Sequence, residues 1–120
     1  MPSPVRPTRV TCAFRFEAAH HLPLHPGKCH GLHGHGYRME VTVEGDLRPD
    51  GMVLDFSEIE EVVGREVISR WDHRLLNDLV DNPTAEVLAW EAFDRLVTAG
   101  LPVRTLILWE TADSRVEVGR

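Results

Sequence analysis

Lysine, cysteine and long apolar runs are scarce in this sequence, and each shortage argues against a class of protein. Lys28 is the sole lysine among 13 basic residues, and 19 acidic residues bring the formal net charge to -6, which argues against nucleic acid as an electrostatic partner. Two cysteines, Cys12 and Cys29, do not make a disulfide framework. No apolar run approaches the ~18 residues of a membrane span, and the N-terminus lacks the apolar stretch of a signal peptide. We therefore expect a cytoplasmic protein with free thiols and no membrane or nucleic-acid partner.

Histidine, in contrast, is concentrated in one short segment, with six of the seven histidines between residues 20 and 35. His33 and His35 share a face if the chain is extended there, because side chains alternate along a strand. A preceding strand that ends at His20 would supply a third imidazole. Zinc uses three histidines in catalytic sites and keeps its fourth position open for water or substrate. The sequence thus predicts a Zn2+ site of His20, His33 and His35, with Cys29, His33 and His35 as an alternative set.

Alternating hydrophobicity predicts strands on both sides of this segment. Every second residue is apolar from Val10 to Ala18, and the pattern recurs from Tyr37 to Val43. Residues 21–32 contain prolines and glycines without periodicity and are predicted to form a loop. Two further strands are predicted at residues 103–110 and 116–118.

Helical periodicity occupies the middle of the chain. A first helix is predicted from Asp55, which together with Glu58 resembles a capping box. Its expected apolar stripe consists of Phe56, Ile59, Val62, Val63 and Val67. A second helix is predicted after an Asn82-Pro83 cap, with an apolar face of Ala85, Leu88, Ala89, Ala92, Phe93 and Leu96.

The order of these elements, β-β-α-α-β-β, predicts an α+β domain with an antiparallel sheet and two helices on one face. We expect this single domain to span residues 8–120, after a flexible N-terminal arm of residues 1–7. An antiparallel sheet of this size has exposed edges, which favour pairing with another copy. A homo-oligomer is therefore expected.

Other candidates for chemistry lie outside the three histidines. Cys29 stands beside Lys28, and a nearby cation lowers the pKa of a thiol, so Cys29 is a candidate proton acceptor or nucleophile. Asp72 and His73 form an adjacent pair, which is weak evidence by itself. Glu110 ends an apolar strand, where a carboxylate is out of place in a core, and we interpret it as functional.

Six segments together resemble the family of 6-pyruvoyl-tetrahydropterin and 6-carboxytetrahydropterin synthases. Each segment alone would be weak evidence, but six in family order over residues 10 to about 112 are specific. The segments are Phe16-Glu-Ala-Ala-His20-His-Leu22, Cys29-x3-His33-Gly-His35, Val53-Leu-Asp55-Phe56, Asp72-His73-x2-Leu76-Asn77, Asn82-Pro-Thr84-x-Glu86 and Trp109-Glu110-Thr111.

The resemblance implies the tunnelling fold (T-fold), in which β-β-α-α-β-β subunits pool their strands into a barrel. Such subunits usually form trimers that stack in pairs as a homohexamer, with active sites shared at subunit interfaces. By the same resemblance, the zinc ligands would be His20, His33 and His35.

The resemblance also implies roles for the remaining candidates. Cys29 would be the catalytic cysteine, with Asp72 and His73 of a neighbouring subunit as its proton-relay partners. The substrate-binding residues would be Glu110, which anchors the N-H edge of the pterin ring, and Thr84 and Glu86, which line the ring pocket.

The branch of the family is indicated by the three residues between Cys29 and His33. This spacing is typical of the carboxy branch, which converts 7,8-dihydroneopterin triphosphate to 6-carboxy-5,6,7,8-tetrahydropterin, with release of acetaldehyde and triphosphate, on the route to queuosine. A 6-pyruvoyl-tetrahydropterin synthase, which keeps the three-carbon side chain, is the first alternative. A noncatalytic zinc-bearing pterin-binding protein is the second.

Overall fold

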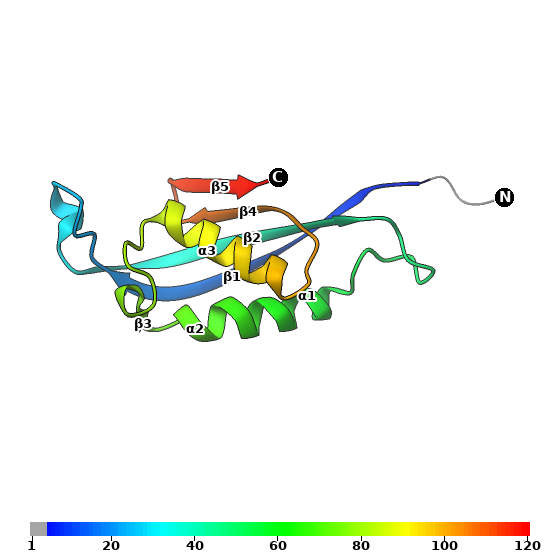
Figure 1. Ribbon diagram of the computed structural model, residues 1–120, viewed down its shortest axis with the longest axis horizontal. Helices are drawn as coiled ribbons and strands as arrows, with labels where there is room; N and C mark the ends of the chain where they lie inside the picture. Colours follow the sequence, from blue (N-terminus) through cyan, green and yellow to red (C-terminus); the bar gives the residue numbers. More distant parts are fainter. Residues whose placement is uncertain (1–4) are drawn as a thin grey trace.

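The structure, a computed structural model, describes residues 5–120 apart from the side chain of Cys29. Residues 1–4 of the expected N-terminal arm lie outside the described residues, and residues 5–7 have no regular secondary structure. The chain forms a five-stranded sheet in the order β3-β1-β2-β4-β5 (Figure 1). Its strands are β1 (Thr8–His20), β2 (His33–Gly45), β3 (Arg74–Leu75), β4 (Val103–Trp109) and β5 (Arg115–Gly119).

All four predicted strands are present, and β1 and β2 are longer than the alternating pattern indicated. The fifth strand, β3, pairs in parallel with Ala18 and Ala19 of β1, so the sheet is mixed, whereas a wholly antiparallel sheet was predicted. A strand of two residues is too short for alternation to reveal it. The outer edge of β1 from Thr8 to Glu17 has no partner strand within the described chain.

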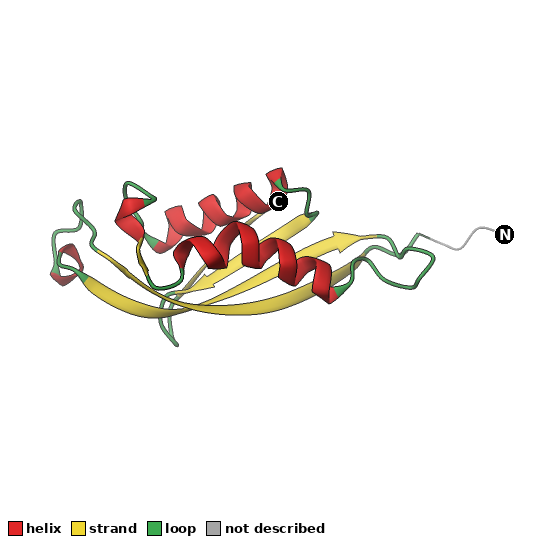
Figure 2. Cartoon of the chain, turned by 90° about the horizontal axis from the view of Figure 1, so that it is seen from below, coloured by secondary structure: helices red, strands yellow, loops and turns green. Residues whose placement is uncertain are grey.

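Two helical segments lie side by side on the same face of the sheet (Figure 2), which confirms the predicted α+β architecture. The helical segment nearer β4 and β5 is α3 (Ala85–Thr98), and all six residues of its predicted apolar face are buried. The other helical segment is continuous and consists of α1 (Phe56–Val63), a π-helical segment (Gly64–Ile68) and α2 (Ser69–Trp71).

The apolar stripe of the first helix differs from the predicted one. Phe56 is 62% exposed, whereas Ile59, Val63, Val67 and Trp71 are at most 1% exposed. These four buried residues recur at intervals of four. Four residues of an α-helix turn through about 400°, so the row would drift by about 120° over three intervals. The π segment, with its wider i→i+5 turn, offsets this drift and keeps Trp71 against the core.

Arg95 of α3 supports the π segment from the neighbouring helix. Its Nε donates a hydrogen bond to the backbone carbonyl of Glu66 at 3.1 Å. Carbonyl groups that a helix leaves unpaired need another partner when they are buried. The contact therefore joins the two helices at the point where the first one widens.

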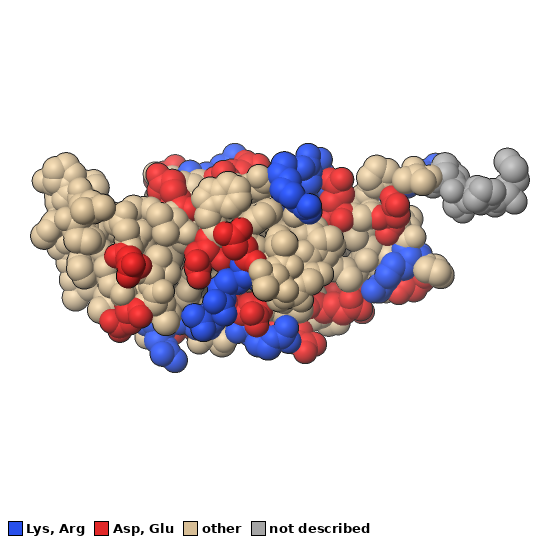
Figure 3. Space-filling view, viewed as in Figure 1, with Lys and Arg blue, Asp and Glu red and all other residues tan. Residues whose placement is uncertain are grey.

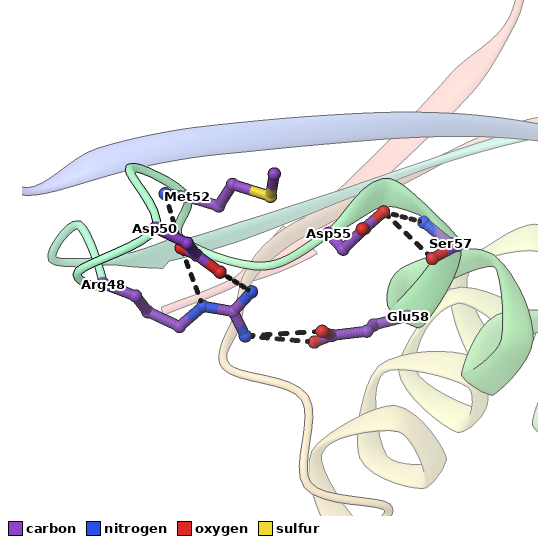
Figure 4. Close-up of polar contacts among 6 residues, drawn as sticks. All are labelled: Arg48, Asp50, Met52, Asp55, Ser57 and Glu58. Atoms are coloured by element: carbon purple, nitrogen blue, oxygen red, sulfur yellow. Dashed lines mark hydrogen bonds and ion pairs between the residues drawn. The ribbon is translucent and has the colours of Figure 1, made fainter.

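The predicted cap of the first helix is confirmed, but the capping box is not. Asp55 accepts a hydrogen bond from the Ser57 N-H at 2.9 Å. The Glu58 carboxylate instead accepts from Arg48 at 3.3 and 3.4 Å, and Arg48 also binds Asp50 (Figure 4). The loop before α1 is thereby tied to the first turn of the helix.

The predicted cap of α3 is wrong by two residues. The N-cap is Thr84, whose hydroxyl accepts from the Val87 N-H at 3.2 Å, and Asn82 lies outside the helix. Pro83 does not occupy the first helical turn, because its carbonyl oxygen faces His20 at 2.8 Å. The helix therefore begins beyond Pro83, at Ala85.

No helix among residues 5–120 is both long enough and apolar enough to span a bilayer. On the face seen in Figure 3, acidic and basic side chains are interleaved. This face therefore lacks the continuous basic surface that typically binds nucleic acid.

Candidate metal centre

The pairing of β1 with β2 brings three histidines together at the closed end of the hairpin. His20 is the direct cross-strand partner of His33, and Ala18 is the partner of His35. Because side chains alternate along strands, all three imidazoles project from the face that the helices cover. Their ring centroids lie 4.5 to 5.1 Å apart, and His20 is fully buried. The histidines predicted as zinc ligands therefore form one cluster.

Backbone carbonyls orient two of these rings. The Nδ1 atom of His20 lies 2.8 Å from the Pro83 oxygen, and that of His33 lies 2.7 Å from the Gly31 oxygen. A carbonyl only accepts, so each Nδ1 carries a proton, and in the neutral ring Nε2 has the lone pair. The two Nε2 atoms face each other at 3.0 Å. Two lone pairs at this distance are favourable only with a proton or a cation between them.

Glu110, directly after β4, completes the cluster. Its Oε1 lies 3.0 Å from Nε2 of His35, but the contact lacks hydrogen-bond geometry, and this buried nitrogen has no hydrogen-bond partner among the described residues. Burial lowers the pKa of His35; Glu110 opposes this shift, and His20 and His33 add to it. His35 is thus held in the neutral form that binds metals.

The donor set fits a zinc ion. One donor atom from each of the three histidines and from Glu110 can be chosen so that all four lie within 4.8 Å of one another. Tetrahedral zinc with ligands at about 2.05 Å needs donor atoms roughly 3.3 Å apart, so small side-chain movements would suffice. Three imidazole nitrogens are by themselves a donor set of catalytic zinc sites, in which the fourth position stays open, so the site does not need Glu110 as a ligand. The sequence indicated Glu110 as functional but not its contact with His35, because the register of β4 against β2 could not be read from either strand alone.

Asp72 and His73 lie beside β1 at Glu17. The Asp72 carboxylate accepts from the Glu17 N-H at 3.0 Å, and the His73 N-H donates to the Glu17 carbonyl at 2.6 Å. The hydrogen bond from Glu17 and then the contact with His73 hold the pKa of Asp72 below its ordinary value. Asp72 Oδ1 also lies 3.0 Å from Nδ1 of His73, and His73 has a left-handed backbone with φ of 59°. The adjacent pair is therefore a fixed unit.

His73 lines a depression of about 510 Å³. The lining includes Glu17, Gly34 and Gly36, which by alternation belong to the sheet face opposite to the three histidines. The two glycines leave this face open, since a Cβ at Gly36 would lie 3.1 Å from a Glu17 carboxylate oxygen. His35 of the histidine cluster also belongs to the lining of this depression, but no hydrogen bond or ion pair between described residues joins His73 to the cluster of the same chain.

The remaining predicted residues have different surroundings. Glu86 and Glu110 line one depression of about 260 Å³, whereas the Thr84 hydroxyl caps α3. Cys29 lies in a short 3-10 turn, Lys28–His30, shortly before β2, and its side chain lies outside the described part of the structure.

Comparisons with known proteins point to one family. A sequence model of the family described as 6-pyruvoyl tetrahydropterin synthase (PTPS) matches residues 9–120. A Synechocystis protein named 6-carboxy-5,6,7,8-tetrahydropterin synthase is 43% identical over 96 residues, 74% of each chain. A Pyrococcus furiosus protein named dihydroneopterin monophosphate aldolase is 34% identical over 113 residues, 92% of this chain and 96% of the other. The structure of Caenorhabditis elegans 6-pyruvoyl tetrahydropterin synthase matches with a TM-score of 0.86 at 25% identity, over 96% of both chains.

Proposed function

Because this chain belongs to the 6-pyruvoyl tetrahydropterin synthase family, we propose that it is a zinc-dependent 6-carboxy-5,6,7,8-tetrahydropterin synthase. The observation that carries the proposal is the convergence of three imidazoles and Glu110 on one point. The name of the Synechocystis relative and the spacing of Cys29 from His33 support the carboxy branch. The fold is that of the tunnelling-fold subunits of this family.

The proposed substrate is 7,8-dihydroneopterin triphosphate. One substrate molecule and one water give 6-carboxytetrahydropterin, acetaldehyde and triphosphate, so all atoms balance. The three-carbon side chain of the substrate is oxidised by two electrons and the pterin ring is reduced by two. No external oxidant or reductant is therefore needed. The protein therefore has to bind the substrate and move its protons.

His20, His33 and His35 would hold the zinc ion, with a position left open to substrate. Bound zinc would supply Lewis-acid polarisation of the side-chain hydroxyl groups of the substrate. Glu110 would accept hydrogen bonds from the N-H edge of the pterin ring, an edge of donors that suits a carboxylate. Glu86, in the depression that Glu110 also lines, and Thr84 would border the ring pocket.

Cys29 and the Asp72–His73 pair would transfer the protons. Cys29 would accept a proton as thiolate. Asp72, with its lowered pKa, stays ionised at neutral pH and contacts Nδ1 of His73. This leaves Nε2 of His73 available for proton exchange, the role that imidazoles serve as general acids and bases.

We further propose a homo-oligomer with shared active sites, built from trimers that stack in pairs as a hexamer. The edge of β1 from Thr8 to Phe16, which has no partner strand among the described residues, supports strand pairing between copies. The absence of a hydrogen bond or ion pair between His73 and the histidine cluster among the described residues supports donation of the relay by a neighbouring subunit. We place the enzyme in the cytoplasm, on the route to queuosine.

A second candidate is 6-pyruvoyl-tetrahydropterin synthase activity. It is favoured by the description of the family and by the likeness to the Caenorhabditis elegans structure. The test is incubation of zinc-loaded protein with 7,8-dihydroneopterin triphosphate, followed by assay of acetaldehyde and by mass spectrometry of the pterin. Acetaldehyde equal to the substrate consumed, with a carboxylated pterin, supports the carboxy branch. Consumption without acetaldehyde supports the pyruvoyl branch. A parallel incubation uses 7,8-dihydroneopterin monophosphate, and turnover of this compound alone would match the name of the Pyrococcus furiosus relative.

A further inference from the structure

Asn77 makes two hydrogen bonds to the backbone of one residue, His21. Its Nδ2 donates to the His21 carbonyl at 2.9 Å, and its Oδ1 accepts from the His21 N-H at 2.9 Å. The two residues are 56 positions apart. Asn77 ends one of the six segments of the family resemblance, and the proposed function leaves it without a role.

These bonds continue the edge of the sheet beyond the point where the backbone pairing of β1 with β3 stops, with a side chain in place of a strand. β3 pairs with β1 only at Ala18 and Ala19, and β1 ends at His20. The donor and acceptor of the Asn77 amide serve His21 as the backbone of a neighbouring strand would. Because the His21 nitrogen is bonded directly to the His20 carbonyl carbon, the amide fixes the backbone that carries the His20 ring.

The ring of His20 is held from the same segment of chain. Its Nδ1 faces the Pro83 carbonyl, six residues after Asn77. Leu76, next to Asn77, is fully buried and anchors the start of this segment in the core. The backbone beside His20 and the imidazole itself are thus both positioned by residues 76–83.

We infer that Asn77 is a positioning residue of the metal centre, which directs His20 Nε2 toward the point where the donor atoms of the three histidines converge. This inference rests on the proposed zinc site. Groups that orient metal ligands usually contribute 10- to 100-fold to affinity. A residue that merely closed the loop would change thermal stability and leave the affinity for zinc unchanged.

The test measures the affinity for Zn2+ of the full chain by competition with a chromophoric chelator, together with the melting temperature of the metal-free protein. Asn77→Ala removes both bonds. Asn77→Asp keeps the size and the acceptor but sets a carboxylate oxygen against the His21 carbonyl. We expect both variants to bind Zn2+ about 10- to 100-fold more weakly than wild type, and Asn77→Asp decides the question if Asn77→Ala does not fold.

Two control variants isolate the effect. Asn82→Ala makes the same chemical change in the same segment, at a side-chain oxygen that has no partner among the described residues. His21→Ala removes an imidazole but keeps the backbone groups that Asn77 binds. Both should retain the wild-type affinity. Wild-type affinity in the foldable Asn77 variants would overturn the inference, whereas absence of zinc binding by the wild type would overturn the proposed metal centre itself.

Discussion

Zinc should raise the melting temperature of the wild-type protein, and replacement of His33 by Ala should remove most of that increase. His33 supplies one of the two Nε2 lone pairs that face each other at 3.0 Å. A cation between them turns an unfavourable contact into two metal bonds. Because the unfolded chain does not preserve this geometry, zinc binds mainly to the folded state and stabilises it.

The size of the effect follows from linkage. At a free Zn2+ concentration about 100 times Kd, binding adds about 2.7 kcal/mol to the free energy of unfolding. A chain of 120 residues has an entropy of unfolding of about 0.25 kcal/mol/K, at roughly 2.1 cal/mol/K per residue. The melting temperature should therefore rise by about 11 °C. If His33→Ala weakens zinc binding about 100-fold, the same zinc concentration adds only about 0.4 kcal/mol, which is a rise of about 2 °C.

The assay is thermal unfolding of chelator-treated protein with and without Zn2+, at one fixed protein concentration because subunit assembly also affects the transition. His25→Ala is the matched control, since His25 is exposed and its ring accepts a hydrogen bond from the Gly27 N-H, away from the cluster. This variant should show the full wild-type rise. An equal rise in wild type and His33→Ala would refute the three-histidine site, and so would a wild type indifferent to zinc.

Four further outcomes are expected. Cys29→Ala should lose turnover of 7,8-dihydroneopterin triphosphate and retain zinc, as measured by metal analysis of the inactive protein; turnover near the wild-type rate would contradict a catalytic thiol. Co-refolding Cys29→Ala with His73→Ala should restore about a quarter of the wild-type activity, the fraction of shared sites that random pairing around a ring leaves intact, whereas sites contained within one chain would stay inactive. Arg95→Met should lower the free energy of unfolding by about 1–2 kcal/mol in urea titrations, because the carbonyl of Glu66 in the π segment loses its charged donor; an unchanged midpoint would mean that the segment does not need this bond. The folded-state pKa of Asp72 is lowered, so its contribution to stability is present above its unfolded value near pH 4 and is lost as the pH falls through the folded value; Asp72→Asn should flatten the dependence of the melting temperature on pH only in that acidic range.

The features that could be predicted from the sequence are those that depend only on residues within one continuous segment. The alternation along β1 and β2 fixed which residues face the helices, and hence the common face of His33 and His35. The apolar face of α3 was predicted in full because a regular α-helix repeats its contacts at fixed intervals. A third predicted feature, the Asp55 cap, needs only the residues that follow it.

What could not be predicted depends on contacts between distant segments. The burial of Trp71 in line with Ile59 requires a π segment, whose bonding pattern has no sequence signal of its own. The cap of α3 moved to Thr84 because the carbonyl of Pro83 faces His20, 63 positions away. The contacts of Glu110 with His35 follow from the register between two strands, which alternation leaves open.

The two groups of candidate catalytic residues meet β1 within a few positions, one at its edge and the other on its face. Asp72 and His73 bind the backbone of Glu17 at the edge of β1, whereas His20 points to the side that the helices cover. A strand directs its backbone groups to its edges and its side chains to its two faces, and among the described residues no hydrogen bond or ion pair joins His73 to the three histidines. In the proposed oligomer, a second copy that pairs at the uncovered edge of β1 would add its own groups beside those of the first copy. The proposed assembly would therefore complete each active site from two subunits, and the co-refolding of Cys29→Ala with His73→Ala tests this arrangement.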